Sequence, residues 1–214
     1  MMKIEIEKIR SDVLRAMTDS LGSHDWDHTE RVCHLCNHIG HVEGADMEIL
    51  ETAAILHDIG RMEQHRSQNK ICHAEVGAVM ARAILERYQV SQEKIARIVH
   101  CIETHRFRGN KIPLSLEAKI LFDADKLDSI GAIGLARAYV FSGEIGAKVH
   151  DRNVNIDKTD TYSKDDTGYR EFLVKLRYVK DRMITDEGKR MAIKRHQFMV
   201  DFFDVINREV LGEQ

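Results

Sequence analysis

Apolar residues recur at helical spacing along almost the whole chain, and this pattern leaves little room for any other fold class. The stretch HAEVGAVMARAILERY, residues 73–88, places apolar side chains three and four positions apart, as one buried helix face requires. Strand signals, meaning β-branched alternation and Asn-Gly turns, are almost absent. Pro113 is the single proline in 214 residues, so the sequence contains few helix breakers. The sequence therefore predicts an all-α protein, a bundle of helices.

The helical pattern runs on without a convincing domain boundary, so we expect one domain that spans residues 1–214. A chain of this length can bury one hydrophobic core. Polar residues without periodicity fill residues 143–168, which we expect to form a long loop or flap, a kind of segment that is often functional. We expect the main motifs within residues 24–145, and C-terminal helices over residues 169–211 that pack on the core.

The composition excludes several classes of protein. Hydrophobic residues make up 43% and charged residues 31%, as in a globular protein rather than a disordered one. The net charge of −3 gives no general attraction to nucleic acid or to an anionic membrane. The N-terminal segment is charged and periodic, unlike a signal peptide, and four cysteines are too few for a disulfide framework. We therefore expect a cytoplasmic protein that binds no membrane and no nucleic acid polymer, with oligomerisation left open.

Two polar residues interrupt the most apolar segment of the chain. In AAILHDIGR, residues 53–61, His57 and Asp58 stand side by side among residues that belong in a core. Burying an imidazole beside a carboxylate is costly unless something satisfies both groups. A metal ion held between them near a helix end would do so, whereas a hydrogen-bonded core histidine beside a helix-terminal aspartate is the plainer alternative.

Polar residues elsewhere in the chain favour the metal. His28 lies early in the preceding helical segment, and Arg31, three positions on, shares its helix face. The apolar segment that ends at Phe122 leads directly into several acidic residues, of which Asp125 follows Ala124 and is expected to point inward. Lys126 follows at once.

A histidine, a His-Asp pair about thirty residues later and a distant aspartate in an ADKL context together resemble the HD-domain superfamily of metal-dependent phosphohydrolases. The segments HDWDHTERV, AAILHDIGR and LEAKILFDADKLDSIGA carry this resemblance, which covers most of the chain and is greatest for small stand-alone bacterial members. It implies an all-helical fold with a metal at its centre. The positions that match the metal ligands are His28, His57, Asp58 and Asp125.

The chemistry of those residue types fits hydrolysis of a phosphate ester or anhydride. A divalent ion on two imidazoles and two carboxylates leaves room for water and substrate, and it lowers the pKa of bound water. We expect Asp58, Arg31 and Lys126 to take part in catalysis, and Arg31 and Lys126 to hold the phosphate. Which of Mn, Fe, Ni, Zn, Co or Mg is bound is left open, and so are the general acid and base.

Further histidines raise the question of a second ion. His73, His100 and His105 are expected to face the substrate phosphate, with a second metal or a structural role as the alternatives. A CxxC at Cys33 and Cys36, within the sequence VCHLCNHIGH, lacks the second ligand pair that a structural zinc site needs. The histidines of that stretch share one helix face, which we expect to be exposed.

The favoured function is a metal-dependent phosphohydrolase that acts on a small phosphorylated metabolite, in particular a nucleotide. A di-iron oxygenase on the same fold is the alternative, and it requires His73 with His100 or His105 as true ligands. A non-catalytic binding module that keeps the metal is the third possibility. Nothing in the sequence specifies the base, sugar or chain length of a substrate.

Overall fold

The computed structural model is all-α, and it describes residues 4–17, 26–68, 70–106 and 111–213. The all-α fold class expected from the sequence is confirmed, because no strand occurs among these residues. None of the described helices is long and apolar enough to cross a lipid bilayer. The chain divides into two compact units, Met1–Asp125 and Lys126–Gln214.

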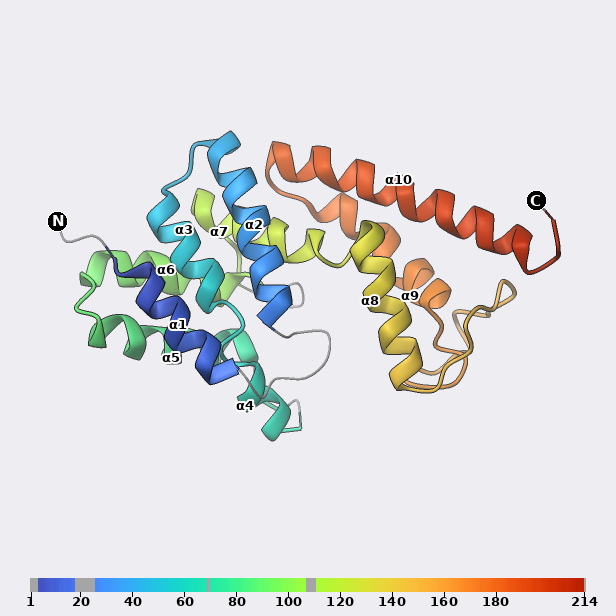
Figure 1. The fold of residues 1–214 in the computed structure, drawn as a ribbon, viewed down its shortest axis with the longest axis horizontal. Coiled ribbons are helices and arrows are strands. Elements are labelled where there is room, and N and C mark those ends of the chain that lie inside the picture. The colour runs from blue at the N-terminus through green and yellow to red at the C-terminus, as the bar shows by residue number, and fades with distance from the viewer. Residues whose placement is uncertain (1–3, 18–25, 69, 107–110, 214) are drawn as a thin grey trace. The chain divides into compact units, whose positions relative to one another are not determined.

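The first unit is a cluster of helices around one buried helix. Its elements are α1 Ile6–Met17, α2 Trp26–Glu43, α3 Met47–Leu56, α4 Arg61–Arg66, α5 His73–Arg87, α6 Gln92–Thr104 and most of α7 Leu116–Leu127. Helix α3 packs against α1, α2 and α6, while α5 packs against α6 and α4 (Figure 1). Every residue of α3 from Thr52 to Leu56 is buried. A helical segment that is buried on every side lies inside a core, so the turn that follows α3 begins in the protein interior.

Side-chain caps mark the start of two helices of the first unit, α3 and α6. The carboxylate of Asp46 accepts a hydrogen bond from the Ile49 amide and starts α3. The hydroxyl of Ser91 accepts one from the Lys94 amide and starts α6. These bonds satisfy amides that lack a partner in the first turn of a helix. The cap on α6 matters for the interior, because α6 runs from Ser91 towards the buried His105 at its other end.

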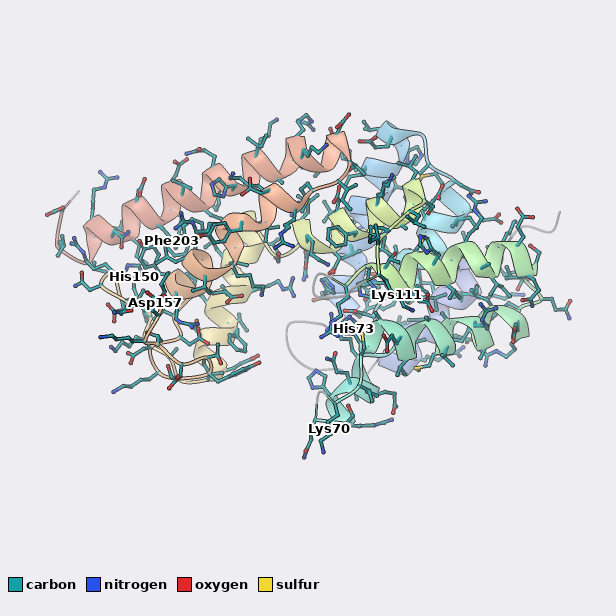
Figure 2. All side chains as sticks on the ribbon, turned by 180° about the vertical axis from the view of Figure 1, so that it is seen from behind. Lys70, His73, Lys111, His150, Asp157 and Phe203 are labelled. Carbon is teal, nitrogen blue, oxygen red and sulfur yellow. The ribbon has the colours of Figure 1, made fainter. Side chains whose placement is uncertain are left out.

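The second unit consists of α8 Gly131–Glu144, α9 Gly168–Val174, a 3₁₀ helix Leu176–Arg182 and α10 Asp186–Glu209. Helix α10 packs against α8 and the 3₁₀ helix. The ring of Phe203 on α10 lies 4.7 Å from that of Phe172 and 5.1 Å from that of Tyr169, and it forms the centre of an aromatic cluster (Figure 2). The helix expected after residue 168 is thus interrupted at Lys175, where φ is −141° and a 3₁₀ turn replaces the α-helix.

Hydrogen bonds and an ion pair hold the C-terminal half of the irregular segment between α8 and α9 to the start of α9. The guanidinium of Arg170 donates to Asp166 Oδ1 and to the Thr159 carbonyl, both at 2.8 Å. The other carboxylate oxygen of Asp166 accepts a hydrogen bond from the Tyr162 amide. Arg170 and Asp166 are themselves buried, so this ion pair holds the segment to the start of α9.

Replacing Ser91 by alanine is expected to lower the free energy of unfolding by about 1 kcal/mol, because the Lys94 amide loses its acceptor. Ser91→Asp keeps an acceptor and is expected to stay within a few tenths of a kcal/mol of the natural protein. Urea denaturation followed by circular dichroism measures both. Equal losses in the two variants would show that the hydroxyl does not act as a cap.

Candidate metal centre

The His57–Asp58 pair lies in the turn that follows the buried helix α3. Helix α3 ends at Leu56, His57 is its C-cap residue, and the amide of Ile59 bonds back to the Leu56 carbonyl. Helix α4 starts at once, with Gly60 as its N-cap. His57 is 0% exposed and Asp58 is 1% exposed. The pair is therefore held inside the first unit, at the end of a helix whose apolar surface fixes its position.

Four other helices bring ligand-type side chains to this pair. His28 comes from the first turn of α2 and Asp125 from the last turn of α7. His73 opens α5, as Figure 2 shows, and His105 follows the last residue of α6. Two groups of three residues each bring ligand atoms within 4.8 Å of one another: His28 with His57 and Asp125, and Asp58 with His73 and His105.

Asp58 joins the two groups through its two carboxylate oxygens. Its Oδ2 lies 3.6 Å from His28 Nε2 and 3.7 Å from His57 Nε2. Its Oδ1 lies 3.6 Å from His73 Nε2 and 3.5 Å from His105 Nε2. One oxygen of the carboxylate thus faces each group.

The spacing of the paired histidine nitrogens, and of His28 and Asp125, fits ions held between them. Two donor atoms that each lie about 2.1 Å from one ion, about 90° to 110° apart, are about 3.0 to 3.4 Å from each other. The Nε2 atoms of His28 and His57 are 3.4 Å apart, and those of His73 and His105 are 3.2 Å apart. His28 Nε2 and Asp125 Oδ1 are also 3.4 Å apart.

The tautomers of the imidazole rings also favour ions held between the Nε2 atoms. The Nδ1 atoms of His57 and His105 lie 2.7 and 2.6 Å from the carbonyls of Ala54 and Ile102. The Nδ1 atom of His73 lies 2.9 Å from Gln64 Oε1. Carbonyl oxygens only accept, so each Nδ1 donates and each neutral ring turns an Nε2 lone pair inward. Lone pairs that face each other at 3.2 Å, as in His73 and His105, need a cation between them.

A proton is a poor candidate for that cation. Burial lowers the pKa of His57 from 6.5 to about 4 and that of His73 to about 2. Neighbouring Asp58 raises both pKa values but does not offset the burial. Both rings are consequently neutral near pH 7, and neutral imidazoles with carboxylates are the ligands that divalent transition metals prefer.

Close contact between two glycines brings the two groups together. A Cβ atom at Gly60 would lie 2.3 Å from the His73 carbonyl oxygen and 2.7 Å from the Gly77 amide nitrogen. The turn that carries Asp58 therefore rests directly on the backbone of α5, which no larger residue at position 60 would allow without a shift. This contact sets the distance between Asp58 and His73.

Three further residues were expected to act at the site. Arg31 is half-buried on α2, one turn after His28. Lys126 follows Asp125 on α7 and is the first residue of the second unit. His100 accepts a hydrogen bond from the Leu114 amide through its Nε2 at 3.0 Å and belongs to neither group.

Two residues of the site were missed by the sequence analysis. Arg61 Nε lies 2.9 Å from Asp58 Oδ1, and Arg61 Nη1 donates to Gln64 Oε1 at 3.4 Å. Gln64 in turn holds His73. Both belong to α4, which has six residues and is too short to show a periodic pattern. The only feature of the sequence that could have identified Arg61 was its position at the end of the segment AAILHDIGR.

The competing cluster on α2 stays outside both groups. The histidines at positions 34, 38 and 41 are exposed, as expected from the sequence. Cys33 and Cys36 are buried, and burial raises the pKa of the Cys33 thiol to about 11. Protonated thiols in a core are poor metal ligands, so these side chains serve packing.

Comparisons with known proteins show which family the chain resembles. Residues 25–130 match the family model described as HD domain. The chain is 35% identical over 212 residues to the protein YpgQ of Bacillus subtilis (strain 168), which covers 97% of this chain and 95% of YpgQ.

Solved structures are similar over nearly the whole chain. The crystal structure of Bacillus subtilis YpgQ in complex with ADP has a TM-score of 0.74 at 31% identity and covers 95% of this chain and 94% of that one. An HD-superfamily hydrolase from Bacillus thuringiensis has a TM-score of 0.78 at 28% identity and covers 98% of both chains. Both likenesses extend across the two compact units.

Replacing Gly60 by alanine is expected to cost about 1–3 kcal/mol of unfolding free energy, because the new methyl group collides with the backbone of α5. Gly143→Ala is the matched control, since a Cβ atom there meets nothing within 4 Å. Its stability is expected to equal or exceed that of the natural protein. Urea denaturation of both variants checks the difference, and a fully stable Gly60→Ala would refute the close approach.

The metal-free protein is expected to lose stability as the pH falls from 6.5 towards 4. The folded-state pKa of His57 is depressed to about 4, so the unfolded chain binds more protons throughout that window. His57 alone accounts for a loss of about 2 kcal/mol between pH 7 and pH 5. Urea midpoints of chelator-treated protein measure it.

The control for this pH dependence is a histidine outside the core. His57→Asn is expected to lower the pH dependence by about the share of His57, leaving the share of His73, whereas the exposed His34→Asn is expected to leave it as in the natural protein. An unchanged dependence in His57→Asn would contradict the assignment.

Proposed function

The chain belongs to the HD-domain superfamily of metal-dependent phosphohydrolases, and from that premise we propose that it hydrolyses a phosphate ester or anhydride of a small metabolite, in particular a nucleotide. The observation that carries the proposal is the pair of three-residue groups, supplied by α2, α5, α7 and the ends of α3 and α6, that the Asp58 carboxylate joins. Ligand-type side chains from five separate helices meet there in a buried setting. Packing alone gives no reason for that many polar groups to share one point.

The principal ion would be held by His28, His57, Asp58 and Asp125, the four positions matched by the sequence resemblance. A divalent ion on such ligands acidifies water and polarises a phosphoryl oxygen. Asp58 and Asp125 supply two negative charges that balance one divalent ion. The neutral imidazoles add donors without adding charge, which leaves the ion free to accept further oxygen ligands.

His73 and His105 are proposed as ligands of a second position rather than as phosphate contacts. Their Nδ1 hydrogens are already used by Gln64 and by the Ile102 carbonyl. The Nε2 atoms therefore carry lone pairs and cannot donate to a phosphate oxygen. Their place beside Asp58 Oδ1 suits a cation instead.

Arg31 is the proposed phosphate contact on α2. It lies one turn from His28 on the same helix face, and a guanidinium binds phosphate oxygens in pairs. Lys126, next to Asp125 in the chain, remains the second candidate from the sequence. His100 is not part of the proposed site, because its Nε2 is engaged by the Leu114 amide.

A nucleotide is the favoured substrate class because one relative binds a nucleotide. YpgQ of Bacillus subtilis was crystallised with ADP, and it resembles this chain over 95% of its length. Neither the base nor the number of phosphates follows from that likeness.

The pair of histidine groups also meets the condition set for a di-iron oxygenase. His73 and His105 lie where a second iron would need them. The hydrolase is favoured because the full-length likeness is to an HD-superfamily hydrolase. Oxygen consumption measured beside phosphate release separates the two functions.

Asp58→Ala is expected to remove bound metal and to lower phosphate release by about a thousand-fold or more, because the shared carboxylate is lost. The assay is elemental analysis of tag-free protein combined with a panel of nucleotides and phosphoesters. Asp204→Ala, at an exposed position of α10, is the matched control and is expected to behave as the natural protein. If Asp58→Ala keeps both its metal and full turnover, the proposed function is wrong.

A further inference from the structure

Arg61 places a fixed positive charge on the oxygen that a second metal ion would use. Its Nε lies 2.9 Å from Asp58 Oδ1, closer than either of the two histidine nitrogens that face the same oxygen. Its side chain is 17% exposed, so the guanidinium touches the buried carboxylate and still reaches solvent. Arg61 therefore competes with any cation bound between His73 and His105.

Charge balance disfavours the second metal ion in its competition with Arg61. The carboxylates of Asp58 and Asp125 carry two negative charges, which one divalent ion neutralises. A second divalent ion would leave the centre with two excess positive charges, and Arg61 adds a third. Positive charges in a poorly solvated interior repel strongly unless an anion balances them.

Gln64 connects this charge to the histidine pair. Its Oε1 accepts hydrogen bonds from Arg61 Nη1 at 3.4 Å and from His73 Nδ1 at 2.9 Å. The guanidinium and the ring of His73 thus share one acceptor, and both depend on the short helix α4 for their position. A guanidinium is also the side chain best suited to a phosphate oxyanion, so an incoming phosphate has a partner at hand.

We propose that Arg61 is the counter-ion that sets how many metal ions the centre holds. With the guanidinium on Asp58, the His28–His57 position fills first and the His73–His105 position binds weakly. A phosphate anion draws the guanidinium away and supplies negative charge, and the second ion then binds more tightly. By thermodynamic linkage, the second ion must tighten binding of the phosphate by the same factor. This inference rests on the proposed metal centre.

The test is a manganese titration of metal-free protein, by equilibrium dialysis with elemental analysis and by electron paramagnetic resonance. The natural protein is expected to bind one Mn²⁺ tightly and a second at least about ten-fold more weakly. Arg61→Gln is expected to tighten the second step by about ten-fold or more and to give the spin-coupled signal of a manganese pair. Arg61→Met, which keeps the aliphatic stem, provides the same test if the glutamine variant folds poorly.

Two further variants test whether the change in the second manganese-binding step arises at Arg61 and at the His73 position. Arg66→Gln removes a positive charge from the same helix, at an exposed residue paired with Glu63, and is expected to titrate as the natural protein does. Adding His73→Gln to Arg61→Gln is expected to abolish the gained ion. Inorganic phosphate is expected to tighten the second step about ten-fold in the natural protein and by less in Arg61→Gln.

The outcomes separate this inference from the proposed function. An unchanged second step in both Arg61 variants overturns it, as does a gained ion that survives His73→Gln. Manganese binding to none of the variants, with the natural protein also empty, overturns the proposed metal centre together with this inference. A first step that is tight in every variant supports the metal centre independently of Arg61.

Discussion

The carboxylate of Asp58 is the interaction on which the rest of the structure depends. Its two oxygens face two pairs of imidazole nitrogens at 3.5–3.7 Å, and a guanidinium lies against one of them. An ionised carboxylate in a core is tolerated only when opposite charge or hydrogen bonds compensate for lost solvation. Compensation here calls for cations, and the donors around Asp58 are of the kind that bind metals.

The fold of the first unit can be understood as the means of bringing that carboxylate inside. The C-terminal half of helix α3, from Thr52 to Leu56, is buried on all sides, so it carries the turn after Leu56 into the interior. The two-glycine contact between Gly60 and Gly77 then presses this turn onto α5. Neither feature contributes a ligand. Together they bring His28 of α2, His73 of α5 and His105 at the end of α6 within 3.6 Å of one carboxylate.

The sequence was sufficient for the parts of this picture that rest on periodicity or on a motif. Helical spacing gave the all-α class, which the described helices confirm. The family resemblance is confirmed, and the four residues that it matched lie around one point. Tertiary contacts could not be predicted from the sequence, which does not show that Gly60 meets Gly77. Arg61 and Gln64 were missed because they belong to a helix of six residues, too short to show a periodic pattern. His73 and His105 were named, but their hydrogen-bonded Nδ1 atoms, which decide their role, depend on geometry.

The hydrogen bonds of His57 and His105 have a consequence for how the centre is assembled. Each ring bonds to the carbonyl three residues earlier, in the last turn of its own helix, where carbonyls lack intrahelical partners. The ends of α3 and α6 thus aim their own imidazoles as soon as each helix forms. The orientation of these rings is then a by-product of secondary structure, and an ion that bound between them would meet rings whose rotational freedom has already been lost.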